Sequence, residues 1–385
     1  MDFDLSEEQR LLKESVDRLI EDRYGDFDRR KSYQQKPQGW SRAVWQDFTD
    51  LGLTALPFGE SSGGIGGGPV ETMIVMEAIG RGLVLEPFLQ TTVLGGAALK
   101  LGASTALAEA MVSQIIEGSL ILALAHTEPQ SRYNLSNVQT SARLANGQYI
   151  LDGRKSLVEN GDSADKLIVS ARTSGGPTDG DGITLFLVDA KQPGVQIHGS
   201  ASQDGKRVAE IIFSGAKASK DEILGVPDQG HALLSELICI GIAALAAESV
   251  GAMERLHAMT VDYLKTRKQF GVPIGSFQVL QHKSADMMVE LEQARSMACY
   301  AAMMLSASPN ERMAALSAVK IAINKASRFV GQQAIQLHGG IGMTLEYQAS
   351  HYFKRLTAIE QTFGDTDYHL AELAKVEGEE AAIIA

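Results

Sequence analysis

The chain has 385 residues, of which 44% are hydrophobic and 21% charged, so it is long enough to form two or three packed units. Its formal net charge of -12 argues against a nucleic-acid-binding protein, because that binding depends on clustered Lys and Arg. The two cysteines, Cys239 and Cys299, argue against a disulfide framework and favour a reducing compartment. The acidic start MDFDLSEEQRLLK lacks the apolar run of a signal peptide, so the expected location is the cytoplasm.

The first third of the chain is predicted to be helical. Ser6, followed by Glu7, Glu8 and Gln9, is typical of a capping box, and apolar residues then recur at helical spacing. The same spacing predicts further helices at residues 41–52, 69–81, 89–100 and 104–117. The glycine-rich stretch 59–68 is interpreted as a flexible connection, since it joins no strand to a helix and no Lys-Ser/Thr follows it.

A change of pattern at residue 119 predicts a second domain. The segments SLILALAHTE, QYILDG, KLIVSART, ITLFLVDA and VQIHGS are short, rich in β-formers and separated by turn signals such as Asn146-Gly147. They predict an antiparallel β domain over 119–228.

From residue 229 the pattern is helical again. Segments near 231–266, 277–305, 311–337 and 345–360, joined by short loops, predict a four-helix bundle. The predicted fold class is therefore α+β, mainly α, with domains at 1–118, 119–228 and 229–385. The apolar run 237–247 is too short for a membrane span before Glu248 interrupts it, so a buried core helix is expected there.

Several familiar catalytic patterns are missing from the sequence. There is no GxSxG serine-hydrolase turn, no HExxH pair, and no Rossmann or Walker fingerprint between a strand and a helix. The histidines are scattered, so no metal site is predicted.

Two segments could instead bind a dinucleotide. TRKQFGVPIGSFQ, residues 266–278, offers Arg267 for a pyrophosphate, Gln269 and Gln278 as amide donors, and the flat ring of Phe270. The alternative is an ordinary basic helix C-terminus followed by a turn.

The second segment is GQQAIQLHGGIG, residues 331–342. Here Gln336 and the bare peptide groups of Gly339 and Gly340 could meet phosphate or sugar oxygens. The alternative is a simple glycine C-cap.

Taken together, these segments resemble the acyl-CoA dehydrogenase family. The resemblance covers nearly the whole chain and is carried by FDLSEEQRLL, LGLTALPFGESSGGIGGG, the hairpin LDGRKSLVENG at 151–161, RKQFG and QLHGGIG. It implies N-terminal helices, a central β domain and a C-terminal four-helix bundle. It also implies FAD bound between the β domain and the bundle, with its adenine end reaching a neighbouring subunit.

The family's cofactor residues can be placed on this sequence by motif. The resemblance implies that the ADP portion of FAD is held by Arg267, Gln269, Phe270 and Gln278, together with Gln336, Gly339 and Gly340 from a dimer mate. Thr366 matches a threonine that usually touches the cofactor.

The family's catalytic base is missing from its usual place. Most members carry a glutamate in a Tyr-Glu-Gly-Thr turn, which aligns with Phe363-Gly364-Asp365-Thr366, so Gly364 takes the position of the glutamate. The alternative position on the first bundle helix is occupied by Gly241. Asp365, one residue along and one methylene shorter, is the remaining candidate base.

The segments that usually face the flavin are altered as well. The family's Trp-Ile-Thr corresponds to Leu157-Val158-Glu159, which replaces a hydroxyl donor with a glutamate. Its Gly-Ser-Asp after Thr-Glu-Pro corresponds to QSRYNLSN, which contains no glycine.

This pattern favours a subunit of a heteromeric acyl-CoA dehydrogenase, in which a homologous partner supplies the glutamate, most simply in a heterotetramer. Two-subunit members of this kind act on pimeloyl-CoA and related dicarboxylyl thioesters, and on steroid side-chain thioesters. The resemblance is closest to the small subunit of the pimeloyl-CoA type, and it implies an electron-transfer flavoprotein or similar acceptor. Two alternatives remain: a self-sufficient homotetramer or dimer with Asp365 as base, and a noncatalytic scaffold of the same fold.

Some charged residues carry smaller expectations. Arg355 and Lys354 are expected to pair with Glu360 or Glu346 on a helix surface, with binding of a substrate carboxylate as the alternative. Glu159 and Asp162 are expected to be solvated at the end of the hairpin. The tail 376–385 is expected to be a frayed terminus or an interface arm.

Overall fold

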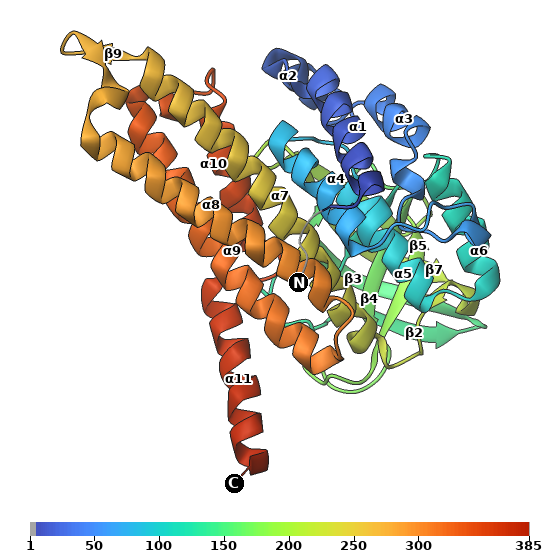
Figure 1. The fold of residues 1–385 in the computed structure, drawn as a ribbon. Coiled ribbons are helices and arrows are strands. Elements are labelled where there is room, and N and C mark those ends of the chain that lie inside the picture. Colours follow the sequence, from blue (N-terminus) through green and yellow to red (C-terminus); the bar gives the residue numbers. More distant parts are fainter. Residues whose placement is uncertain (1–4, 385) are drawn as a thin grey trace. The chain divides into compact units, whose positions relative to one another are not determined.

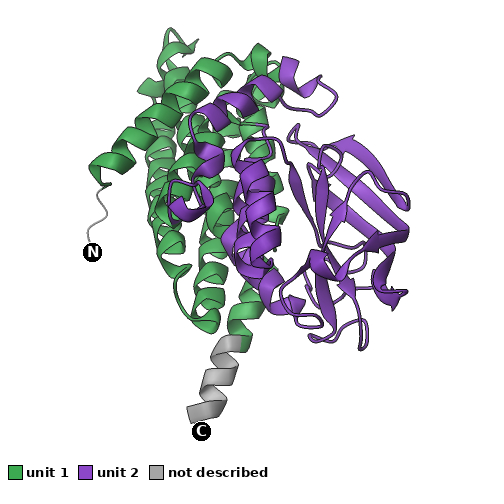
Figure 2. Ribbon diagram, turned by 90° about the vertical axis from the view of Figure 1, so that its right-hand side faces the viewer, with its two compact units in different colours: residues 1–31, 69–84, 242–385 green, residues 32–68, 85–241 purple. Residues whose placement is uncertain are grey.

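A computed structural model describes residues 5–384, with side chains to residue 375. The chain forms two compact units (Figure 2). Unit 1 comprises Met1–Lys31, Pro69–Val84 and Ile242–Ala385, and unit 2 comprises Ser32–Gly68 and Leu85–Gly241.

Helix α1, Glu7–Tyr24, begins unit 1 at the expected capping box. The Ser6 hydroxyl accepts the Gln9 N–H at 3.2 Å, and the Gln9 side chain accepts the Ser6 N–H at 3.0 Å. These reciprocal bonds satisfy two backbone donors that a helix start leaves open. The capping prediction is therefore confirmed.

Long helices form the rest of unit 1 (Figure 1). The four predicted bundle helices are present as α7 (Gly230–Thr266), α8 (Gln278–Met304), α9 (Pro309–His338) and α10 (Ala349–Gln361). The first twelve residues of α7 belong to unit 2 by the division above. A further helix, α11 (Thr366–Ile384), packs on α9 and was not predicted. The tail expected to fray is helical to Ile384, and Ala385 lies outside the described residues.

Helix α4, Pro69–Gly82, approaches α7 unusually closely. A Cβ atom added to Gly80 would lie 1.8 Å from the carbonyl oxygen of Glu248, and one added to Gly251 would lie 1.8 Å from that of Glu77. Side chains at these positions are excluded by the opposite backbone. The two glycines allow the helices to touch backbone to backbone.

Unit 2 contains shorter helices and the β-sheet. Three helical segments match expectations: α3 (Arg42–Asp50), α6 (Thr105–Ile116), and the pair formed by the π-helix η3 (Leu89–Gly95) and α5 (Gly96–Gly102). Helix α2, Phe27–Gln34, spans the division between the units and was not predicted.

The sheet has eight strands in the order β6-β7-β3-β2-β4-β5-β8, with β1 also pairing with β4. Their bounds are β1 Leu122–Ala125, β2 Ser141–Ala145, β3 Gln148–Glu159, β4 Lys166–Arg172, β5 Ile183–Asp189, β6 Val195–Ala201, β7 Arg207–Ala218 and β8 Ile223–Leu224. The sheet is mainly antiparallel, as predicted, but β1 runs parallel to β4, with Leu122 opposite Lys166. Its buried face includes Leu151, Leu167 and Phe186.

The predicted hairpin at 151–161 is wrong. Residues 151–159 belong to one long strand, β3, which pairs with β2 and β7 and bulges between Lys155 and Val158, and residues 160–161 lie in the turn that follows it. A bulge inserts an extra residue without reversing the chain. Leu157 sits in this bulge with a φ of 54°, which is uncommon for a branched residue.

The expected solvation of Glu159 and Asp162 is also wrong. The Glu159 carboxylate lies 3.0 Å from the ammonium of Lys206, and only 14% of its side chain is exposed. Asp162 accepts a bond from Arg207 at 2.5 Å. Strand β7, missing from the sequence prediction, begins at Arg207 directly after Lys206, and its pairing brings both cations to the end of β3.

Among the described residues, α7 is the one helix long and apolar enough to cross a membrane, and 78% of its most apolar window is buried inside the chain. Burial of this kind is typical of a core helix.

Candidate functional site

A small β-hairpin follows α7 and carries the first predicted nucleotide segment. Lys268–Gln269 pairs with Val272–Pro273, and the turn between them places Phe270 at φ 54° and Gly271 at φ 82°. Two successive positive φ angles are typical of a tight two-residue hairpin turn. Phe270 is 92% exposed at the tip.

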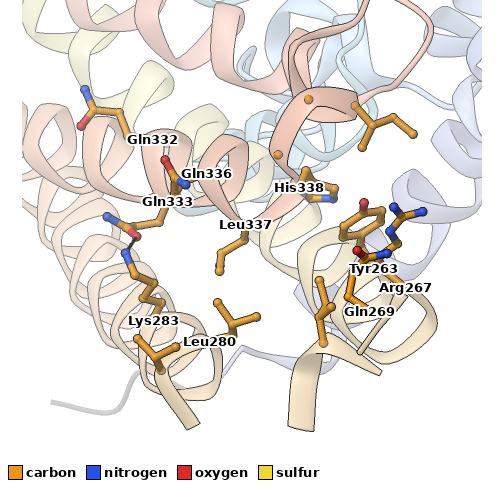
Figure 3. Close-up of a pocket in the computed structure, with 15 residues that line it drawn as sticks. Tyr263, Arg267, Gln269, Leu280, Lys283, Gln332, Gln333, Gln336, Leu337 and His338 are labelled. Carbon is orange, nitrogen blue, oxygen red and sulfur yellow. Dashed lines mark hydrogen bonds between the residues drawn. The ribbon is translucent and has the colours of Figure 1, made fainter. Parts of the chain in front are cut away.

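A cavity of about 1030 Å³ lies beside this hairpin, wholly within unit 1 (Figure 3). Its lining is formed by Tyr263, Arg267, Gln269, Ile274, Val279, Leu280, Lys283, Gln332, Gln333, Gln336, Leu337, His338, Gly339, Gly340 and Ile341. Five of the eight predicted cofactor residues are in this set: Arg267, Gln269, Gln336, Gly339 and Gly340. One chain brings these five residues to the lining of a single cavity. The expectation that Gln336, Gly339 and Gly340 act from a dimer mate stays a prediction.

The other three predicted cofactor residues, all in the described part of the chain, are not part of this lining. Phe270 is at the exposed hairpin tip, Gln278 is the exposed first residue of α8, and Thr366 is the first residue of α11. Their cofactor roles stay predictions.

The lining of the cavity also includes a positively charged side chain, Lys283, that the sequence analysis did not predict. Figure 3 shows Arg267 and Gln269 at one end of the cavity and Lys283 at the other, with Leu280 and Leu337 between them. The Lys283 ammonium donates to the Gln333 side-chain oxygen at 2.9 Å. Lys283 lies five residues after Gln278 on α8, and that spacing gave no sign that it would face the second segment. The cavity therefore offers separate cations and several amides to an anionic ligand.

The glycine loop after α9 presents bare peptide groups. Gly339 ends the helix with a φ of 64°, as the C-cap alternative expected, and a Cβ added at Gly339 or Gly340 would meet no atom within 4 Å. A ligand could approach this backbone closely. Both the cap and the nucleotide interpretation are compatible with this geometry.

An aromatic cluster supports this loop. The His338 Nδ1 bonds to the Ala334 carbonyl at 2.8 Å, and its Nε2 lies 3.2 Å from the Tyr347 hydroxyl. Since the carbonyl can only accept, Nδ1 carries the proton and Nε2 accepts from the tyrosine. The Tyr263 ring lies 4.7 Å from the imidazole, and burial lowers the pKa of His338. The cluster joins the end of α9 to the residues that follow the loop.

The turn at 362–366, where the family carries its base, has an unusual backbone. Phe363 has a φ of 61° and Gly364 a φ of 118°. The Asp365 carboxylate accepts the Tyr368 N–H at 2.9 Å, so it caps the first turn of α11. The candidate base therefore has a structural bond in this turn.

Two buried groups on α9 and α11 flank this turn. Lys320 donates to the Ile359 carbonyl at 2.6 Å and to the Asn324 side chain at 2.9 Å, and burial lowers its pKa to about 7. His369, 2% exposed, contacts the Ser317 hydroxyl and the Phe363 carbonyl, each at 3.0 Å. Both sides of the turn are thus held from within unit 1.

The expected partners of Arg355 are wrong. Its guanidinium makes two bonds to the Glu248 carboxylate, at 2.6 and 2.9 Å, and both side chains are at least 95% buried. Glu360 is paired with Arg328 instead. Arg355 is thus paired inside the bundle, and its burial offers no support for binding a substrate carboxylate from solvent.

In unit 2, the segment aligned with the flavin-facing Trp-Ile-Thr has a different character. Leu157 is 72% exposed, and the glutamate that replaces the threonine is engaged by Lys206. Behind it, Lys155 is fully buried and donates to Glu128 at 2.6 Å. The exposed leucine and the ion-paired glutamate thus differ from the Trp-Ile-Thr that the resemblance implies.

Metal chemistry gains no support from the described residues, in which no group of three or more His, Cys, Asp or Glu could hold an ion.

Comparison with known protein families matches most of the chain. Residues 6–119 match the N-terminal domain of acyl-CoA dehydrogenases, 123–216 the middle domain, and 228–377 the C-terminal domain. The acyl-CoA dehydrogenase IpdE2 of Mycobacterium tuberculosis is 32% identical over 354 residues, which cover 91% of this chain and 91% of that protein.

Solved structures agree. The ChsE4-ChsE5 complex from Mycobacterium tuberculosis contains a chain with a TM-score of 0.87 and 25% identity, covering 98% of this chain and 99% of that one. An FAD complex of PigA has a TM-score of 0.88 and 26% identity, with coverage of 98% and 99%. The chain therefore belongs to the acyl-CoA dehydrogenase family of FAD-dependent oxidoreductases, and FAD is the cofactor that its relatives indicate.

Proposed function

We propose that this chain is the FAD-binding subunit of a heteromeric acyl-CoA dehydrogenase whose catalytic glutamate comes from a homologous partner. The observation that carries the proposal is the turn at 362–366, where Gly364 takes the place of the base and Asp365 caps α11. A dehydrogenase needs a carboxylate that reaches one defined α-proton. The proposal assigns that carboxylate to the partner.

The lining of the unit 1 cavity supports binding of the ADP half of FAD there. Its donor set pairs Arg267, suited to a pyrophosphate, with the amides of Gln269 and Gln336. The peptide groups of Gly339 and Gly340 face open space that a phosphate or sugar could fill. Phe270, Gln278 and Thr366 complete the proposed cofactor set. When bound, FAD would supply the acceptor for the hydride that leaves the β-carbon of the substrate.

The residues of this chain would bind and orient that cofactor. Arg267 and the glycine loop would hold the diphosphate end, while Leu157 and the ion-paired Glu159 offer no hydroxyl donor at the flavin-facing position. Because this chain has residues suited to bind the cofactor but lacks the usual catalytic side chains, we expect the flavin to be shared with a partner that has them.

Substrate, acceptor and assembly are part of the same proposal. The substrate is pimeloyl-CoA or another dicarboxylyl or bulky acyl-CoA, and electrons pass to an electron-transfer flavoprotein or similar acceptor in the cytoplasm. The ChsE4-ChsE5 relative, described as a complex of two proteins, supports a heteromeric arrangement, most simply a heterotetramer.

Co-expression tests the proposal. The chain should be purified alone and together with a family member that keeps the glutamate, and mass, visible spectrum and acyl-CoA-dependent reduction of a dye measured. We expect negligible turnover by the single chain and a yellow, active heteromer. High turnover by the single chain would refute the proposal.

An isosteric substitution separates capping from catalysis at Asp365. Asparagine caps helices about as well as aspartate but cannot accept the proton. In the heteromer, Asp365→Asn should keep assembly and turnover within about twofold, whereas replacing the partner's glutamate with glutamine should lower turnover by about 100-fold or more. Loss of turnover in a stable Asp365→Asn heteromer would support the self-sufficient alternative.

A further inference from the structure

The turn at 362–366 differs from a catalytic turn by more than one substitution. A Cβ atom added to Gly364 would lie 2.4 Å from the His369 Nε2 and 2.8 Å from its Cδ2, with the Tyr368 ring at 2.6 Å. Real Cβ contacts are not this short, so a neighbour would have to move. Two of the three nearest atoms belong to His369.

The imidazole of His369 cannot easily move aside. The Phe363 carbonyl can only accept, so Nε2 carries the proton and donates to it at 3.0 Å. Nδ1 then accepts from the Ser317 hydroxyl, also at 3.0 Å. Both ring nitrogens of a buried side chain are engaged, and moving the ring would leave these groups without partners.

The hydrogen bond from His369 to the Phe363 carbonyl also fixes the backbone beside Gly364, where an added Cβ would collide. It fixes the carbonyl directly before Gly364, where Phe363 itself has a φ of 61°. On the other flank of the turn, Lys320 holds the Ile359 carbonyl at 2.6 Å. Ser317 and Lys320 are three residues apart on α9, so one helix face anchors both flanks.

We propose that His369 is the positioning residue of this turn, and that it locks Phe363 and Gly364 in a shape with no room for a side chain at position 364. The position of Thr366 at the start of α11 is set by the same lock. The proposal rests on the proposed function only in naming position 364 as the place of the family's base. A glutamate restored there would meet the imidazole before it could reach a substrate.

A double-mutant cycle tests the lock without any substrate or cofactor. The melting temperature of the full chain should be measured for Gly364→Ala, His369→Ala and the double variant. Gly147→Ala is the control for an alanine at a positive φ, because the φ of Gly147 is 82°, against 118° at Gly364, and an added Cβ there meets nothing within 4 Å. It reports the cost of an alanine at a positive φ without a steric conflict.

We expect Gly364→Ala to lower the melting temperature by about twice as much as Gly147→Ala, or to prevent folding when Gly147→Ala folds. The double variant should lose less than the sum of the single variants. His369→Gln, whose amide N–H can still reach the Phe363 carbonyl, should retain more stability than His369→Ala. A Gly364→Ala effect equal to that of Gly147→Ala, or strict additivity with His369→Ala, overturns the proposal.

The outcome is independent of the co-expression experiment. Gly364→Glu in the chain expressed alone should give no acyl-CoA-dependent bleaching of bound FAD and a lowered melting temperature. A Gly364→Glu chain with native melting temperature would refute the lock even if the heteromer proved active.

Discussion

The ion pair between Lys155 and Glu128 is the most deeply buried charge pair in unit 2. Besides the ammonium at 2.6 Å, Glu128 accepts the Gln139 N–H at 2.8 Å and the Thr140 N–H at 3.0 Å. Burial alone would raise the pKa of Glu128, but the charge of Lys155 and the hydrogen bonds from Lys155, Gln130 and Gln139 lower it to about 2. One carboxylate thus connects β3 to the loop that precedes β2.

Replacing Glu128 should therefore be costly. Glu128→Gln leaves the Lys155 ammonium buried without its anion, and we expect a loss of about 3 kcal/mol in the free energy of unfolding. Denaturant titration would measure it. Glu210→Gln, which breaks a half-exposed pair with Arg154, is the control and should cost less than about 1 kcal/mol. Equal losses of unfolding free energy in the two variants would show that burial of the Lys155–Glu128 pair does not increase its contribution to stability.

His369 predicts a stability change on mild acidification. Burial lowers the pKa of His369 to about 4, below the usual 6.5, while the bond to Phe363 and the charges of Lys320, Glu372 and Asp365 act more weakly. Between pH 6.5 and 4 the unfolded imidazole binds a proton that the folded one does not. Stability should thus be complete above pH 6.5 and fall by up to about 3 kcal/mol towards pH 4.

The measurement is the free energy of unfolding against pH for the native chain and for His369→Gln. We expect the variant to lose less stability over this window. His126, whose pKa burial also lowers to about 4, should leave a residual slope in both proteins. Identical curves would contradict the assignment.

At the scale of the elements, the segment from Gly339 to Met343 depends on its neighbours for its shape. It is a short 3-10 helix, and His338 and Tyr347 join its two flanks through one hydrogen bond. A short helix of this type has few bonds of its own. The presentation of its peptide groups to the cavity should therefore depend on that bond.

Tyr347→Phe removes the hydroxyl and leaves the His338 Nε2 without its donor. We expect about fivefold weaker FAD binding and faster amide exchange at residues 339–343, since one net hydrogen bond is worth about 1 kcal/mol. The comparison is Tyr300→Phe on the outer face of α8, 39% exposed. If both variants bind FAD equally well, the bond does not organise the loop.

The elements that could be predicted from the sequence are those with a persistent pattern. Apolar spacing located α4, α6 and the four long bundle helices, because one buried face repeats along each. Helix α11 was not predicted because its acidic sequence shows no repeating apolar face. Strand β7 was missed although its first residues alternate in burial, since Ser214 and Gly215 interrupt the alternation.

Part of the candidate site could be predicted because short motifs contain residue types that suit phosphate binding. Arg267, Gln336 and the two glycines could be named because their residue types suit phosphate. Lys283 and the lock at His369 could not, since each depends on a neighbour far away in sequence, Gln333 and Ser317 respectively. The capping bond of Asp365 depends on turn geometry, which the sequence left open.

At the scale of the whole molecule, an acidic chain with net charge -12 is expected to take up a dianionic nucleotide only through a local concentration of cations. The unit 1 cavity, with Arg267 and Lys283 in its lining, provides one. The chain should therefore bind nucleotides that contain the ADP half of the cofactor and should not bind those that lack it.

Thermal shifts of the cofactor-free chain test this selectivity. FAD at about 100 times its Kd should stabilise the chain by about 2.7 kcal/mol, ADP should stabilise it less, and FMN, which lacks the ADP half, should have no effect. Arg267→Ala should abolish the ADP shift, whereas Lys268→Ala, next to it but not part of the cavity lining, should not. A shift with FMN alone would contradict an ADP site here.

The contact of Gly80 with the carbonyl of Glu248, and of Gly251 with that of Glu77, also determines how α4 can slide along α7. A side chain at either position would collide with the opposite backbone, so the offset that places these two glycines at the contact is the one at which the helices can come this close. That offset keeps the Arg81 guanidinium 2.7 Å from Glu254, and so makes this surface ion pair an outcome of the glycines rather than a cause of the packing. Gly80→Ala or Gly251→Ala would therefore force these two helices farther apart.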